Sequence, residues 1–177
     1  MDHAETSPPS KPEIDPELIE LAQQVFDLAR RGDAAMLAAV IEKGVPPNLR
    51  NDKGDSLVML ASYHGHADAV RALLEHGADP DLRNDNGQTP IAGAAFKGFE
   101  AVIETLLAHG ANVEGASPDG RTALMIAAMF NRTAIVELLI ANGANPAARD
   151  ANGVNAVDAA GRMGAGDAIA RLKELGG

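Results

Sequence analysis

Glycine recurs along this chain at a fixed interval of 33 residues. Two glycine series keep this interval without a slip: Gly54, Gly87, Gly120 and Gly153, and Gly44, Gly77, Gly110, Gly143 and Gly176. Two series with one period indicate a chain built from one repeated unit, in which each unit buries its apolar face only against its neighbours. We therefore expect a solenoid. Because solenoids bind along an extended face, function is to be sought on a surface that every unit repeats.

Each unit also carries the same order of residue types. Two residues after the first glycine stands a four-residue segment, which reads SLVM, TPIA, TALM or NAVD in successive units. Small residues follow, then a turn such as Gly65-His66, an apolar stripe, and a closing Gly-Ala-Asp or Gly-Ala-Asn. This order resembles the ankyrin repeat family, whose unit reads G-x-T-P-L-H-x-A-A-x-x-G-H and, after an apolar helix, L-L-x-x-G-A-D. The resemblance covers the chain from Asp15 to the C-terminus.

The chain departs from the ankyrin pattern at a few positions. Ser56-Leu57 replaces the usual Thr-Pro in one unit. The usual histidine is replaced at Met59, Ala92, Met125 and Asp158. We expect these departures to cost hydrogen bonds in the local turns and to leave the fold unchanged.

The residue types predict two helices and a finger in each unit. Thr89 can cap a helix with its hydroxyl, and Pro90 suits the first helical position, where its missing N–H is no loss. The stretches 79–88, 112–121 and 145–154 are rich in Asn, Asp, Pro and Gly and predict hairpin-like fingers. The predicted helices cover 16–31, 35–43, 56–64, 68–76, 89–97, 101–109, 122–130, 134–142, 155–163 and 167–175.

The apolar stripe of each second helix and the small residues of each first helix predict the core. Small side chains let the two helices of a unit approach closely, and a stripe at helical spacing faces the neighbouring unit. The residues predicted to be core are Ala94, Ile103, Leu106, Leu107 and Leu139.

The fold class that follows is all-α: an ankyrin repeat solenoid of five helix-turn-helix units, with hairpin-like fingers and a polar capping unit at each end. Asp27 and Lys173 stand in register with apolar or small residues of the inner units, so the end units are predicted to show water a polar face. Residues 1–14 contain three prolines and three acids and are predicted to be a disordered tail. Residues 15–177 are predicted to be a single domain, with units at roughly 15–50, 51–83, 84–116, 117–149 and 150–177.

Composition limits the classes of function. The formal net charge of −10 argues against nucleic acid as the default ligand, because phosphate neutralisation dominates that affinity. The chain has no cysteine, which excludes a thiol nucleophile and a cysteine metal site. Residues 1–5 carry neither a basic region nor an apolar stretch, and no run approaches the roughly 20 apolar residues of a membrane span. We therefore expect a cytoplasmic protein that does not span a membrane.

Three short motifs favour a structural reading over a functional one. His64 and His66 could hold a metal, but no clear third ligand is present, and His66 sits where the ankyrin pattern has a turn histidine. The RGD tripeptide that begins at Arg31 falls in the turn between two helices. The glycine-rich segment 161–166 has no strand before it and no GKS/T after it. No HExxH, GxSxG or paired-carboxylate pattern is present, so we predict no metal, no cofactor and no enzymatic activity.

The candidate binding surface is a row of residues where each first helix ends. In ankyrin proteins these positions resemble the variable ones of the concave face, so the resemblance implies a partner-binding ridge that crosses every unit. Three of the five aromatic residues of the chain fall in this row, and Tyr, Phe, Met and Arg are enriched in contact cores. The alternative is that the aromatic rings pack under the next unit. The predicted ridge consists of Arg30, Arg31, Tyr63, His64, Phe96, Lys97, Met129, Phe130, Arg162 and Met163.

Basic residues are predicted to line the rim of the same groove. Nine of the fifteen Lys and Arg residues fall on positions expected to face it, and acids there are fewer. We therefore expect a groove that is locally basic and aromatic on an acidic protein. The alternative is that the arginines are a solvated rim that keeps the stack soluble. The predicted rim consists of Arg50, Arg83, Arg121 and Arg149.

These observations lead to one function with several alternatives. The predicted function is a non-enzymatic protein–protein interaction module, monomeric, that holds a partner protein or acts as a scaffold across its concave face. The first alternative is a bacterial accessory or immunity-type protein that stabilises or neutralises one dedicated partner. A nucleic-acid binder and a metal-dependent enzyme are more remote alternatives.

Overall fold

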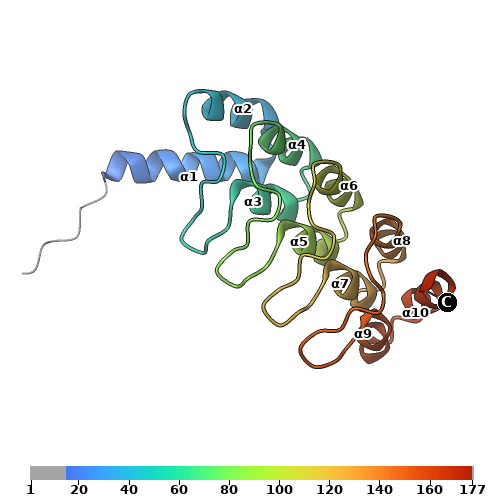
Figure 1. Cartoon of the computed structure of the whole chain (residues 1–177). Coiled ribbons are helices and arrows are strands. Elements are labelled where there is room, and N and C mark those ends of the chain that lie inside the picture. Colours follow the sequence, from blue (N-terminus) through green and yellow to red (C-terminus); the bar gives the residue numbers. More distant parts are fainter. Residues whose placement is uncertain (1–14, 177) are drawn as a thin grey trace, which may run out of the picture.

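The computed structural model describes residues 15–176, which fold into ten helices (Figure 1). They are α1 (Pro16–Arg31), α2 (Ala34–Glu42), α3 (Leu57–Tyr63), α4 (Ala67–Glu75), α5 (Pro90–Lys97), α6 (Glu100–Ala108), α7 (Ala123–Met129), α8 (Thr133–Ala141), α9 (Ala156–Met163) and α10 (Gly166–Gly176). No strand occurs within these residues, which contain one isolated antiparallel bridge, between Arg50 and Ser56. The predicted all-α solenoid is confirmed, and each predicted helix agrees with an observed one to within one residue at either end.

The disordered tail was predicted for residues 1–14, which lie outside the described residues. The division of the rest into one domain with five unit boundaries stays a prediction.

The helices form two layers (Figure 1). The first helices of the units, α1, α3, α5, α7 and α9, pack side by side, each against the next. The second helices, α2, α4, α6, α8 and α10, form the other layer in the same way. The segments that join a second helix to the following first helix project together as a row of fingers. Every repeated position therefore becomes a row that runs across the stack.

Side-chain caps begin the first helices. Ser56 Oγ accepts a hydrogen bond from the Met59 N–H at 3.0 Å, as Thr89 does one unit later. Asn155 Oδ1 accepts from the Asp158 N–H at 2.8 Å, and Asp158 Oδ2 accepts from the Asn155 N–H at 3.3 Å. The expected loss of turn hydrogen bonds is therefore wrong at Ser56 and Asp158. Serine and asparagine offer the same acceptor as threonine, and Asp158 completes a capping box.

Successive units interlock at the turn between their two helices. The turn glycines adopt φ angles of 76°, 82° and 87°, in the left-handed region that favours glycine. A methyl group on these glycines would lie only 2.4, 2.9 and 2.9 Å from a side chain of the next unit. Both the backbone angle and the close contact therefore require glycine. The three pairs are Gly32 with His66, Gly65 with Phe99, and Gly98 with Arg132.

The link between the last two units is polar. Asn131 takes the place of the turn glycine, with a φ of 54°, and Ala165 stands where the preceding units have a larger side chain. The Asn131 side chain itself crosses to α10, where its Oδ1 accepts from the Ala168 N–H at 2.9 Å and its Nδ2 donates to Asp167 at 2.9 Å. Hydrogen bonds thus replace the side-chain packing on the turn that joins the earlier units.

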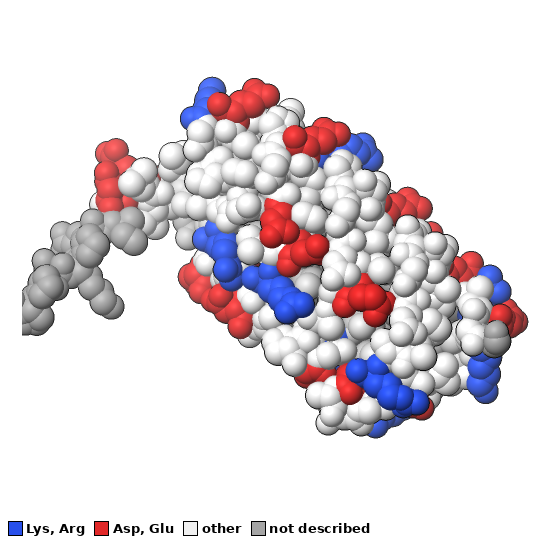
Figure 2. Space-filling view, in the orientation of Figure 1, with Lys and Arg blue, Asp and Glu red and all other residues white. Residues whose placement is uncertain are grey.

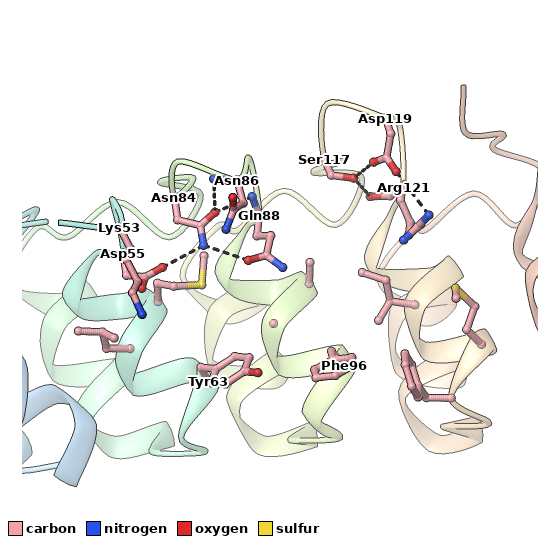
Figure 3. A pocket seen from close by; sticks show the side chains of 17 residues that line it. Lys53, Asp55, Tyr63, Asn84, Asn86, Gln88, Phe96, Ser117, Asp119 and Arg121 are labelled. Atoms are coloured by element: carbon pink, nitrogen blue, oxygen red, sulfur yellow. Dashed lines mark hydrogen bonds and ion pairs between the residues drawn. The ribbon is translucent and has the colours of Figure 1, made fainter. Parts of the chain in front are cut away.

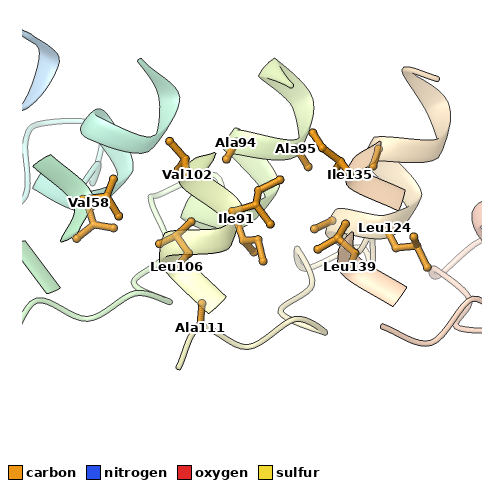
Figure 4. Close-up of a cluster of buried hydrophobic side chains, with 14 of the residues drawn as sticks. Val58, Ile91, Ala94, Ala95, Val102, Leu106, Ala111, Leu124, Ile135 and Leu139 are labelled. Carbon is orange, nitrogen blue, oxygen red and sulfur yellow. The ribbon is translucent and has the colours of Figure 1, made fainter. Parts of the chain in front are cut away.

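The core runs the length of the stack between the two layers. Figure 4 shows its central part. Ile103, Leu106, Leu139 and Ala94 are fully buried, as predicted. Leu107, also predicted to be core, is only partly buried and packs against the core from its edge. Consecutive helical residues are about 100° apart around the axis, so Leu107 lies beside the stripe that Ile103 and Leu106 define.

The N-terminal unit exposes more apolar surface than predicted. Asp27 faces solvent as expected, and Lys173 does so at the other end. Leu18, Ile19 and Leu21 are exposed as well, so the outer part of α1 is mixed rather than polar. The reason is length: α1 has 16 residues where α3 has 7, and its first turns extend beyond the stack (Figure 1).

Replacing Leu106 by alanine should cost about 2–5 kcal/mol of unfolding free energy, the range for truncating a fully buried leucine. Leu107→Ala, one residue away in the same helix, is the matched control and should cost clearly less. Urea denaturation followed by circular dichroism measures both changes. Equal losses for the two variants, or a loss below about 1 kcal/mol for Leu106→Ala, would mean that the stripe is misassigned.

Candidate functional site

The ends of the first helices carry a continuous aromatic row. Tyr63 ends α3, Phe96 lies in the last turn of α5, and Phe130 is the C-cap of α7. The Tyr63 and Phe96 rings are stacked with centroids 6.5 Å apart, and Phe130 meets Phe96 edge to face at 4.9 Å. The three side chains are nevertheless 40%, 41% and 38% exposed. Each ring therefore contacts its neighbour on one side and water on the other.

Beside this row lies a groove of about 720 Å³ between the first helices and the fingers (Figure 3). Its helix side is apolar and is formed by Met59, Leu60, Tyr63, Ala92, Gly93, Phe96, Ile126, Met129 and Phe130. Its finger side is polar and is formed by Lys53, Asp55, Asn84, Asn86, Gln88, Ser117, Asp119 and Arg121. An apolar floor with a polar wall suits a polypeptide segment, which has both apolar side chains and polar backbone groups.

Hydrogen bonds hold the polar wall in place. Asn84 Nδ2 donates to Asp55 Oδ1 at 2.9 Å and to Gln88 Oε1 at 3.0 Å (Figure 3). In the next finger Ser117 Oγ donates to the Asp119 carboxylate, which also pairs with Arg121 at 3.4 Å. The Ser117 hydrogen bond first, and then the Arg121 guanidinium, lower the pKa of the Asp119 carboxyl below its ordinary value.

The groove is not the basic surface that the sequence predicts. Lys53 and Arg121 in its lining are balanced by Asp55 and Asp119. On the face shown in Figure 2, basic and acidic side chains are interspersed, without a continuous basic stripe. The predicted excess of Lys and Arg on groove-facing positions therefore does not extend into the groove itself, because several of those side chains turn elsewhere.

A hollow in the groove floor lies over α5. The register position occupied by Leu60 in α3 and Ile126 in α7 holds Gly93 in α5. A methyl group on Gly93 would lie 3.5 Å from Tyr63 Cδ2 and 3.7 Å from Met59 Sδ, and within 4 Å of no atom of α7. We call this space the Gly93 hollow; its floor is Ala92 and Gly93, and its flanks belong to α3 and α7.

Neighbouring fingers are joined by a backbone hydrogen bond at two places but not between 84–88 and 117–121. The Asp85 N–H donates to the Lys53 carbonyl of the preceding finger at 3.1 Å, and the Ala151 N–H donates to the Asp119 carbonyl at 2.8 Å. Pro118 stands in register with both donors and has no N–H. No hydrogen bond among the described residues joins 84–88 to 117–121. At this point the two fingers are held by the packing of Pro118 on Gly87 in place of a hydrogen bond.

The structure distributes the predicted ridge residues over three places. Tyr63, Phe96, Met129 and Phe130 line the groove. His64 and Lys97 adjoin it, and the Lys97 ammonium lies 4.6 Å from the centroid of the Tyr63 ring. Outside the groove lining lie Arg30, Arg31, Arg162 and Met163.

Arg30 and Arg31 are displaced for a local reason. Arg30 pairs with Asp27 of its own helix at 2.7 Å. Arg31 lines a separate hollow of about 440 Å³ with Leu21 and Met36 at the N-terminal unit. They belong to the capping unit, whose outer side is covered by no other unit within residues 15–176.

The predicted rim arginines are mostly engaged in holding the fingers. Arg50 Nε donates to the Gly54 carbonyl at 2.9 Å, and its Nη2 donates to the carbonyl of Arg83 and to Asp85. Arg149 Nη1 donates to the Gly153 carbonyl at 2.6 Å and pairs with Asp158. Arg83 is exposed, and of the four only Arg121 lines the groove.

The histidines do not form a metal site. The His64 and His66 rings are stacked 6.4 Å apart, and His66 Nε2 lies 2.9 Å from the Arg30 carbonyl, to which it can donate. Burial first, then the charges of His66, Arg30 and Lys97, lower the pKa of His64. Within residues 15–176 no three His, Cys, Asp or Glu side chains come together to hold a metal ion.

Comparison with known proteins agrees with the repeat pattern. Residues 25–116 match the family model of three ankyrin repeats, and residues 119–151 match the model of a single ankyrin repeat. Over 58 residues the chain is 60% identical to a putative ankyrin repeat protein of Pseudomonas aeruginosa. That match covers 33% of this chain and 34% of the relative, so the similarity spans about a third of either protein. None of the described helices is long and apolar enough to cross a membrane.

Gly93→Ala should raise the unfolding free energy by about 0.5–1 kcal/mol, because alanine is the better helix former and the added methyl makes only ordinary contacts. The matched control is Gly87→Ala in the neighbouring finger, where φ is 73° and a methyl group would lie 2.3 Å from Pro118. That variant should be destabilised. Urea denaturation of both tests the assignment, and a destabilised Gly93→Ala would show that the hollow is already filled.

Proposed function

Because the chain belongs to the ankyrin repeat family, we propose that it binds a partner protein along the groove between its first helices and its fingers. Repeats of this family are in general protein–protein interaction modules, and their fold is not an enzymatic one. Membership of the family supports a protein partner in general, and the proposal adds that the partner lies in the groove. The partner, the cytoplasmic location and the monomeric state remain predictions.

The observation that carries the proposal is the half-exposed aromatic row. Three rings in mutual contact form a rigid surface, so little side-chain entropy is lost when a partner covers them. Aromatic residues in the centre of an interface dominate binding energy when a surrounding rim excludes water. Here the prearranged polar wall of the fingers provides one side of that rim.

Simultaneous replacement of Tyr63, Phe96 and Phe130 by alanine tests the proposal. The variant should stay folded, because the core beneath the first helices is intact, and it should lose at least about 30-fold in affinity for the partner, or about 2 kcal/mol. The matched control replaces three other exposed apolar residues, Leu18, Ile19 and Leu21, by alanine and should bind as wild type does.

The measurement has two steps. Wild type and both variants, immobilised, capture proteins from a lysate of the source organism, and mass spectrometry identifies a protein retained by wild type and control but not by the groove variant. Calorimetric titration with that purified protein then gives the affinities. If the folded groove variant binds within threefold of wild type, the groove is not the binding surface.

A further inference from the structure

We propose that the Gly93 hollow is the anchor site of the groove, and that it takes one bulky apolar side chain of an extended partner segment that carries a carboxylate beside this side chain. The proposal rests on the proposed function, because it names the chemistry of the segment that the groove holds.

The apolar half of the proposal follows from the floor of the hollow. The two neighbouring first helices place a leucine and an isoleucine at the register position where α5 has Gly93, so the missing volume is that of one branched aliphatic side chain. The side chains around it are apolar: Met59 and Leu60 on one side, Ile126 and Met129 on the other. A polar group inserted there would lose its hydration without a compensating hydrogen bond. An apolar side chain from the partner restores the volume that the repeat pattern omits.

The extended conformation follows from the opposite wall. The side-chain amide nitrogens of Asn86 and Gln88 donate no hydrogen bond within the described residues, and both side chains are exposed in the groove. A segment lying along the groove presents backbone carbonyls that need donors once water is excluded. Pro118 packs on Gly87 and makes no hydrogen bond to the preceding finger, so the backbone of a segment that passes beside the hollow displaces no hydrogen bond between these two fingers.

The carboxylate follows from the charge at the edge of the hollow. The Lys97 ammonium lies over the Tyr63 ring, which is one wall of the hollow, and it pairs with no carboxylate of residues 15–176. Arg132 approaches the Lys97 carbonyl at 3.5 Å and is likewise without an acidic partner in that part of the chain. The acids of the lining, Asp55 and Asp119, are already occupied by Asn84 and by Ser117 and Arg121.

The surroundings of His64 agree with this polarity. Of the charged groups that lower its pKa, all are basic, and no carboxylate raises it. An extended segment rises about 3.3 Å per residue, so an acid one or two residues from the anchor reaches Lys97. A uniformly anionic ligand is disfavoured by the formal net charge of −10 of the whole chain.

A library of random 12-residue peptides displayed on phage provides the probe. Selection on wild-type protein should enrich sequences in which Leu, Ile, Met, Phe or Trp stands within two residues of Asp or Glu. For a fluorescein-labelled synthetic copy of an enriched peptide, fluorescence anisotropy should show at least a 30-fold loss of affinity with Gly93→Leu, which fills the hollow. Lys97→Gln should weaken binding three- to tenfold.

Matched controls separate the effect of filling the Gly93 hollow from the effect of adding a side chain or removing a charge elsewhere. Ala108→Leu adds the same side chain to an exposed position of α6, and Lys43→Gln removes a lysine charge from the end of α2; each should bind within twofold of wild type. If Gly93→Leu does not fold, Gly93→Ala fills part of the same space, is expected to fold, and should weaken binding at least threefold.

Three results would overturn the proposal: no enriched peptide, enriched peptides without the apolar and acidic pair, or full affinity in the folded Gly93 variants. Full affinity in those variants, with loss in the Tyr63/Phe96/Phe130 variant, would leave groove binding intact and reject only the anchor. Full affinity in all of them would reject both. A further outcome is that wild type binds a labelled dT12 oligonucleotide more tightly than it binds the peptides. If the affinity for this oligonucleotide also falls with Gly93→Leu, the hollow is assigned to a nucleobase instead.

Discussion

The whole structure depends on packing between neighbours one unit apart. At three of the four links between units, the N-cap side chain of a second helix lies on the turn glycine of the preceding unit, as His66 does on Gly32 and Phe99 on Gly65. The glycine accepts both the left-handed angle and the contact, so the units stack in one register. Fixed register turns each repeated position into a row, and the aromatic row and the groove are two of these rows. No contact beyond the neighbouring unit is required to build either of them.

A stack of equivalent units acquires a specific site where one unit departs from the pattern. In the third unit Gly93 removes a side chain from the groove floor, and in the next unit Pro118 removes a hydrogen-bond donor from the fingers. Both changes leave the core beneath the groove closed, because Ile91 and Leu106 are fully buried. The proposed binding specificity and the fold stability therefore reside in different rows of the repeat.

Sequence reasoning reached the fold because its determinants are local. Caps, glycine turns and the 3.6-residue stripe specify helix ends without tertiary information, and even Ser56 and Asn155 cap their helices as the family residues would. The row of Tyr63, Phe96 and Phe130 was also predictable, since Tyr63 and Phe96 are in register and Phe130 stands one residue beyond the equivalent position. Leu107 was wrongly predicted to be fully buried. Consecutive residues of a helix face different directions, and the apolar pattern alone does not distinguish Leu106 from Leu107.

The direction of long side chains was not predictable. Arg50 and Arg149 occupy groove-facing register positions, but each guanidinium bonds to a carbonyl of its own finger, four residues along. The Gly93 hollow could have been found by comparing Leu60, Gly93 and Ile126 in register, although its openness depends on how far the side chains of α3 and α7 reach.

Selective methyl labelling of methionine, read by NMR during titration with the bound partner, tests the account most directly. Met59 and Met129 line the groove and should shift strongly, whereas Met36 at the N-terminal unit should not; a dominant shift at Met36 would contradict binding in the groove.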